Sequence, residues 1–111
     1  GYEIIWAETD KYVGKLLHID VGNRLSKQYH QTKEETVYVL KGVLYNYDQD
    51  DKIQRIMPGE SFHVYPHQIH RFGAADEDVE LIHHKDYDLR IFVYAYSRSS
   101  TVLEIANYLY C

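Results

Sequence analysis

Short apolar runs separated by turn residues limit this chain of 111 residues to a small set of folds. Valine, isoleucine, leucine, phenylalanine and tyrosine gather in these runs, with glycine, proline, asparagine and aspartate between them. β-Branched and aromatic residues favour strands, and turn residues at regular intervals favour antiparallel connections. We therefore predict an all-β protein with strands over residues 3–6, 12–21, 25–30, 35–41, 43–47, 53–56, 61–64, 70–74, 79–83 and 89–96.

The segments between these runs carry recognisable turn signals. Residues 49–52 read Gln-Asp-Asp-Lys and predict a hairpin loop. In the turn that follows residue 56, Pro58 sets its own φ and Gly59 can adopt a positive φ. Many short strands at such spacing are typical of a sandwich or a barrel.

The C-terminal segment has a different pattern. Thr101 and Glu104 match a capping box at the start of a helix, and apolar residues follow at helical spacing up to residue 110. We predict a short C-terminal helix. The alternative is a final strand that continues the apolar run at residues 91–94.

Length and composition narrow the class of protein. A chain of this size is expected to form a single domain, residues 1–111. The net charge of −5 and the scattered basic residues argue against nucleic acid as a partner. No apolar run approaches the roughly 18 residues of a membrane span, and no signal peptide is evident at the start. The single cysteine, Cys111, fits a reducing compartment. We expect a soluble, cytoplasmic protein without a membrane partner.

Four side chains from two separate blocks have the character of a split metal site. Gln28 and His30 are two residues apart in a predicted strand, so they share one face. Glu35 opens an apolar run, where a carboxylate is costly to bury unless it is paired or ligated. His70 in the second block can close the set. One amide, two imidazoles and one carboxylate suit a borderline divalent metal such as zinc, nickel, iron or manganese.

The spacing of these residues resembles the cupin family. Its first motif runs Gly, five residues, His-x-His, three or four residues, Glu, six residues, Gly. Here Gly22 is followed by five residues, Gln28-Tyr29-His30, four residues, Glu35, six residues and Gly42. In the second block, Gly59 and His70 keep the family positions, whereas Tyr65, His67 and Ala74 depart from them. The resemblance implies a cupin-type jelly-roll β-barrel, with the motif-bearing core at about residues 13–83 and residues 84–111 outside the pattern.

The Gln28-Tyr29-His30 triplet is similar to the mannose-6-phosphate isomerase branch of the cupins, in small single-domain form. That resemblance implies one divalent metal ion, zinc first, with manganese, nickel or iron as alternatives. It also implies a phosphorylated sugar as the substrate and proton transfer between adjacent carbons through an enediol.

Further residues are candidates for catalysis or substrate binding. His63, a metal-bound hydroxide or Lys33 could serve in proton transfer. Lys33 and Arg71 could hold a phosphate through charge-assisted hydrogen bonds, with Tyr29 as a third substrate contact. His67 takes the position of a turn glycine, so we expect a turn residue there.

Two further features bear on the site and on assembly. His83 and His84 are adjacent in a predicted strand and should face opposite ways, so we do not expect them to bind one metal as a pair. The apolar strand at residues 91–96 and the twelve tyrosines suggest a homodimer that covers strand edges.

Two other functions compete with the isomerase. One is a metal-dependent cupin dioxygenase, and the other is a non-enzymatic module that binds a sugar or another small ligand. Convergence of basic side chains near the metal would favour the isomerase, and oxygen consumption with iron would favour the dioxygenase. Fold alone does not choose among them.

Overall fold

The computed structural model of the protein describes residues 1–31, 34–86 and 91–93. Every regular element in these ranges is a strand, which confirms the all-β prediction. In chain order the strands are β1 (Tyr2–Glu8), β2 (Tyr12–Ile19), β3 (Gln28–His30), β4 (Glu35–Lys41), β5 (Leu44–Tyr47), β6 (Ile53–Ile56), β7 (Ser61–Val64), β8 (Arg71–Gly73), β9 (Val79–Asp86) and β10 (Ile91–Val93). The described part of the chain contains no helix with the length and apolar character needed to cross a membrane.

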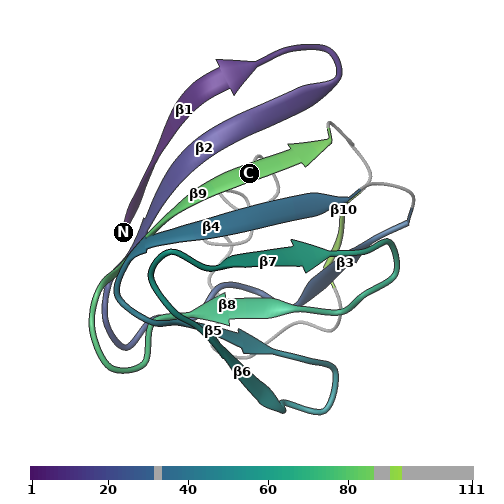
Figure 1. The fold of residues 1–111 in the computed structure, drawn as a ribbon. Coiled ribbons are helices and arrows are strands. Elements are labelled where there is room, and N and C mark those ends of the chain that lie inside the picture. The colour runs from purple at the N-terminus through teal and green to yellow at the C-terminus, as the bar shows by residue number, and fades with distance from the viewer. Residues whose placement is uncertain (32–33, 87–90, 94–111) are drawn as a thin grey trace.

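The strands form antiparallel sheets that pack against each other. The five-stranded sheet has the order β1-β2-β9-β4-β7, and a three-stranded sheet has the order β6-β5-β8 (Figure 1). β3 pairs with β10, and bridges at Arg24–Gly73 and Gln28–His70 connect the segment around β3 to the three-stranded sheet. Phe62 of β7 and Phe72 of β8 meet edge to face at 6.2 Å between ring centroids, so the core joins both sheets.

Alternation along each strand separates a buried face from a solvent face. In β4, Val37 and Val39 are fully buried, whereas Tyr38 between them is exposed. The same alternation buries Leu81 and Val79 in β9. These residues belong to one apolar core, whose members are Leu17, Ile19, Val37, Val39, Leu44, Ile56, Phe62, Val64, Phe72, Ala74, Val79 and Leu81. The apolar core stabilises the fold chiefly by removing these side chains from water.

The predicted strand ranges agree with the structure to within a few residues. The ranges 35–41, 53–56 and 61–64 are reproduced at both ends. The strand predicted at 25–30 is shorter and begins at Gln28, and the strand predicted at 79–83 continues to Asp86. β9 extends because its last residues still pair with β2 on one side and with β4 on the other. The local sequence does not indicate with which strands β9 pairs.

Turn geometry confirms two expectations from the sequence. Gly59 has φ 86°, in the left-handed region that glycine enters without a steric penalty. His67 also has a positive φ, of 65°, and its backbone N–H donates to the carbonyl oxygen of His30 over 2.6 Å. His67 therefore acts as a turn residue that connects the two motif blocks.

Two predictions concern segments that the structure describes only in part or not at all. The C-terminal helix at residues 102–110 lies outside the described residues. The strand predicted over 89–96 is described at Ile91–Val93, and the rest of that range, which motivated the homodimer, lies outside. At one edge of the five-stranded sheet, β1 exposes about half the surface of four large apolar side chains, those of Tyr2, Ile4, Ile5 and Trp6.

Candidate metal centre

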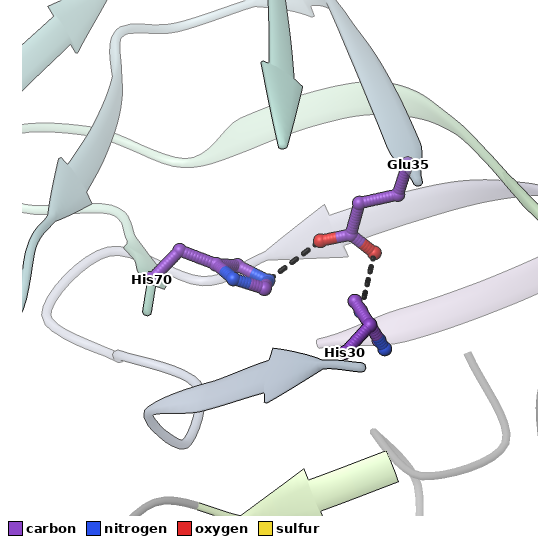
Figure 2. A group of neighbouring side chains, drawn as sticks. All are labelled: His30, Glu35 and His70. Carbon is purple, nitrogen blue, oxygen red and sulfur yellow. Dashed lines mark ion pairs between the residues drawn. The ribbon is translucent and has the colours of Figure 1, made fainter. Parts of the chain in front are cut away.

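Gln28, His30, Glu35 and His70, here called the metal centre, come together between the two sheets. Gln28 and His30 are the first and last residues of β3, Glu35 is the first residue of β4, and His70 lies just before β8. All four side chains are buried. Figure 2 shows the rings of His30 and His70 directed at the carboxylate of Glu35 from two sides. The four residues predicted as ligands therefore share one buried location.

The distances within the metal centre fit a common ion. Nε2 of His70 lies 2.6 Å from Oε1 of Glu35, and Nε2 of His30 lies 3.4 Å from Oε2 of the same carboxylate. The ligand atoms of His30, Glu35 and His70 all lie within 4.8 Å of one another. Ligand atoms about 2.0–2.2 Å from one zinc ion are separated by distances of this order.

Local hydrogen bonds hold His70 in position. Its backbone exchanges two hydrogen bonds of 3.0 Å with Gln28, so the two motif blocks meet as paired strands at this point. Nδ1 of His70 lies 3.2 Å from the carbonyl oxygen of Gln68 and can only donate to it. That tautomer leaves the lone pair of Nε2 directed toward Glu35. A ring fixed in this way through its other nitrogen is typical of metal-ligating histidines.

Several buried polar atoms in the metal centre lack a hydrogen-bond partner among the described residues. They are Oε1 and Nε2 of Gln28, Nε2 of His30 and Oε1 of Glu35. Oε1 of Glu35 approaches His70 closely, but the contact does not have hydrogen-bond geometry. Buried polar groups are nearly always paired, because an unpaired one costs about 1–3 kcal/mol. A cation shared by these atoms would satisfy Gln28 Oε1, His30 Nε2 and Glu35 Oε1 together, so the residues present fit a divalent metal.

The charge state of Glu35 also suits a metal ligand. Burial by itself would raise the pKa of Glu35, but the neighbouring His70 and His83 hold that pKa well below its usual value. The side chain is therefore a carboxylate, the form that binds metal.

His83 is a site residue that sequence reasoning did not select. Its Nε2 lies 2.8 Å from Oε2 of Glu35, and the side chain is 1% exposed. Burial lowers the pKa of His83 against the opposing effect of Glu35, so the ring is neutral and its Nε2–H donates to the carboxylate. The expectation that His83 and His84 face opposite ways is confirmed, because His84 is exposed. The available signal was parity with Val79 and Leu81, which places His83 alone on the buried face.

Two other predicted site residues, His63 and Tyr29, are not brought into the metal centre. His63 lies on the outer face of β7, where it bonds Oγ1 of Thr36 at 2.6 Å and Oε2 of Glu34 at 2.9 Å. Tyr29 alternates away from its two neighbours in β3, and its ring stacks with that of His67.

Arg71, one of the two predicted phosphate contacts, is not brought into the metal centre. Arg71 follows His70 and points to the other face of its strand. Burial and the neighbouring charge of Arg24 lower the pKa of Arg71, against the opposing effect of Asp51. Lys33 lies outside the described residues.

Comparisons with known proteins agree with this architecture. The family model described as "Cupin domain" matches residues 15–85. Among solved structures, KdgF from a Halomonas species superposes with a TM-score of 0.67 at 21% identity, over 76% of this chain and 76% of that chain. An uncharacterized conserved protein with a double-stranded β-helix domain, from Klebsiella pneumoniae, gives a TM-score of 0.74 at 16% identity, over 86% of each chain.

Two further points complete the comparison. The dimethylsulfoniopropionate (DMSP) lyase DddQ from Ruegeria pomeroyi gives a TM-score of 0.70 at 14% identity, over 90% of this chain and 53% of that chain. A search of curated proteins finds no match. At these identities the solved structures establish the jelly-roll fold alone. The family match covers most of the chain and includes the segments that carry the metal centre. The chain therefore belongs to the cupin domain family.

Proposed function

We propose that this protein is a metal-dependent enzyme whose metal ligands are Gln28, His30, Glu35 and His70. The observation that carries the proposal is the convergence of four buried donor side chains from three segments. Polar atoms of Gln28, His30 and Glu35 have no hydrogen-bond partner within the described part of the chain. A fully buried set of this kind is costly to maintain for stability alone. A divalent metal held there would act as a Lewis acid that polarises a substrate oxygen.

The reaction that we propose is aldose–ketose isomerisation of a small phosphorylated sugar, with zinc as the first metal to test. The support is the resemblance of Gln28-Tyr29-His30 to the mannose-6-phosphate isomerase branch. The chemistry of the ligands is consistent with it. The amide of Gln28 carries no charge, so Glu35 is the one anionic ligand among the four. An amide oxygen is also a weaker donor than the imidazole that a histidine would supply, so it leaves more positive charge on a bound metal to act on a carbonyl oxygen.

The surrounding residues have definable roles in this proposal. His83 donates to Oε2 of Glu35 and fixes the plane of the carboxylate. The carbonyl oxygen of Gln68 fixes the tautomer of His70. His63 lies on the outer face of β7 and Arg71 is buried on the side of its strand away from His70, so the proposal does not use them as the base or the phosphate contact.

A second candidate function is supported by one specific observation. His83 places a third imidazole beside Glu35, at 2.8 Å, so that one carboxylate is surrounded by three histidines. Three histidines and one glutamate also occur as the ligand set of cupin dioxygenases. If His83 replaced Gln28 as a ligand, iron chemistry with oxygen would become the better explanation. The solved neighbours include a lyase and a polyketide cyclase, so proteins of this fold carry out more than one kind of reaction.

One experiment separates these functions. Protein purified without added metal is analysed for its elements, then assayed for conversion of fructose-6-phosphate to mannose-6-phosphate with zinc, manganese, nickel or iron. Oxygen consumption is followed in parallel with iron. The isomerase proposal expects stoichiometric metal and isomerisation that His30→Ala abolishes and His84→Ala preserves. Oxygen uptake without isomerisation supports the dioxygenase. Metal binding with neither activity supports a ligand-binding module, and no metal binding overturns the metal centre itself.

A further inference from the structure

Three basic side chains gather at the outer side of the three-stranded sheet, away from the metal centre. They are Arg24, Lys27 and Arg71, here called the basic cluster. Arg71 belongs to β8 and lies on the side of that strand away from His70, whereas Arg24 and Lys27 belong to the segment that leads into β3. The chain as a whole carries a net charge of −5, so three cations at one place require a physical explanation.

Contacts with Tyr47 of β5 bring the two arginines together. Cζ of Arg24 lies 5.4 Å from the centre of the Tyr47 ring, in a cation–π arrangement. Arg71 is the direct cross-strand partner of Tyr47, and directly opposed residues have Cβ atoms about 4.5–5.5 Å apart. Gly73 forms a bridge with Arg24, and a Cβ at Gly73 would lie 2.8 Å from Cγ of Arg24. The missing side chain therefore leaves room for Arg24 beside Tyr47 and Arg71.

Arg71 is the member of the basic cluster whose charge is least compensated. It is 5% exposed, and within the ranges that the structure describes no ion pair or hydrogen bond joins its guanidinium to another residue. Its Nε is shielded from water and has no partner there. Arginine is almost never buried unless it is paired, because removing a charge from water is costly. The like charge of Arg24 adds to that cost.

Among the described residues, Asp51 is the acidic residue that forms an ion pair with the basic cluster. Its Oδ1 lies 2.7 Å from Nζ of Lys27, and this hydrogen bond is the main cause of the lowered pKa of Asp51. The charges of Arg71 and Arg24 also lower that pKa, so all three cations lie near the same carboxylate. The carboxylate already pairs with Lys27, and it does not offset the charges of both arginines.

We propose that the basic cluster is a binding site for a phosphate group, held between Arg24 and Arg71 at the surface of the three-stranded sheet. Guanidinium groups present paired N–H donors that match the oxygens of a phosphate. Arg24 and Asp51 are exposed, so the ligand approaches from solvent and does not enter the interior. The inference goes beyond the proposed function, because neither arginine belongs to the metal centre and no metal is needed for the anion to bind.

The site is tested on the full chain after dialysis against a chelator, so that no metal competes for the anion. Inorganic phosphate and glycerol phosphate are titrated by isothermal titration calorimetry, and nuclear magnetic resonance shifts of the amide groups of Tyr47 and Gly73 report where they bind. The variants are Arg71→Met and Arg24→Met, which keep an aliphatic stem and remove the charge. Lys41→Met, at an exposed position of β4, is the matched control.

The inference expects one or both probes to bind the wild type and to shift the two amide signals. Each arginine variant should weaken binding about tenfold or more, because hydrogen bonds between charged groups are the strong ones. Lys41→Met should bind as the wild type does. Tighter binding of glycerol phosphate identifies a phosphate carried on an organic molecule, and tighter binding of inorganic phosphate identifies the free ion.

A variant of opposite sign sharpens the test. Asp51→Asn removes the carboxylate that competes with the bound anion, so phosphate should bind about threefold or more tightly. Asp51 has φ 61°, and asparagine also adopts the left-handed region, so the loop should keep its conformation. Weaker binding by Asp51→Asn would show that the anion does not lie beside this carboxylate and would count against the site.

Three other results would overturn the site. One is that neither probe binds the wild type, and another is that shifts are confined to amide groups of the metal centre. The third is that Arg24→Met binds phosphate as the wild type does, which is informative even if Arg71→Met does not fold, because Arg24 is exposed. Failure of the proposed function is distinguishable, because it appears in the metal titration and the isomerase assay and leaves these metal-free titrations unchanged.

Discussion

The inner face of the five-stranded sheet has an aliphatic half and a polar half. Both halves lie on the same strands and follow the same pleat and register, but their side chains differ in chemistry. Toward one end, neighbouring strands bring together Leu17, Val39 and Leu81, all members of the apolar core. Toward the other end, the same strands contribute Lys15, Glu35 and His83, all of them buried. No change of backbone geometry separates the two halves.

The difference shows how one sheet divides stability from function. In the aliphatic half, each buried side chain contributes the free energy of leaving water, about 1.5–3 kcal/mol for a large residue. In the polar half, burial costs free energy that partners only partly return. Oε1 of Glu35 in this half, and atoms of Gln28 and His30 beside it, have no hydrogen-bond partner in the ranges that the structure describes. We therefore expect changes in the two halves to affect different measurements.

The largest effect is expected from removal of a ligand. His70→Ala deletes one imidazole of the proposed four-ligand set, so metal affinity should fall by at least about a thousandfold, roughly 4 kcal/mol. Calorimetric titration with zinc measures the loss, and His84→Ala, at an exposed position of β9, is the control. Full metal occupancy of His70→Ala after dialysis against a mild chelator would contradict the ligand assignment.

The next effect concerns the aliphatic half. Leu81→Ala leaves a cavity at a fully buried position, so the free energy of unfolding should fall by about 2–5 kcal/mol. Urea denaturation of the metal-free protein measures it, with Ile82→Ala on the outward side of the same strand for comparison. The folded variant should still bind one equivalent of metal. A large loss of metal affinity without a loss of stability would show that the two halves are not separable.

An intermediate effect is expected from the hydrogen bond between His83 and Glu35 within the polar half. His83→Leu removes the donor to Glu35 and keeps the position apolar, so metal affinity should fall about 10–100-fold, the range typical of residues that orient a ligand. His84→Leu should leave the affinity unchanged. If His83→Leu weakens the metal as severely as His70→Ala does, His83 is itself a ligand, and the dioxygenase alternative gains support.

The smallest change in metal binding is expected at Gln28. Gln28→His exchanges an amide for an imidazole, so affinity should be retained or rise, within about tenfold. Isomerisation should decrease, because a stronger donor reduces the Lewis acidity of the metal and the new ring lacks an assured partner for its second nitrogen. Titration and the fructose-6-phosphate assay are run on the same preparation. Unchanged isomerisation would remove the argument that the amide is selected for that chemistry.

Much of the difference between the two halves could be predicted from the sequence. Period-two alternation around Val37 and Val39 placed Glu35 on the buried face, and the spacing of the two motif blocks selected Gln28, His30 and His70. The strand ranges were recovered because they depend on local preference and on turn residues such as Gly59. These features are encoded within a few residues of the positions that they describe.

Tertiary structure alone decided which side chains from distant strands meet. The sequence indicated that His83 and His84 face opposite ways, but pairing of β9 with β4 was needed to place His83 against Glu35 and Lys85 opposite Glu35. The same pairing rules turned His63 outward, toward Glu34 and Thr36. Alternation defines two faces for every strand, whereas the partner strand and its register define what each face meets. Those depend on contacts between residues far apart in the chain, which no local pattern specifies.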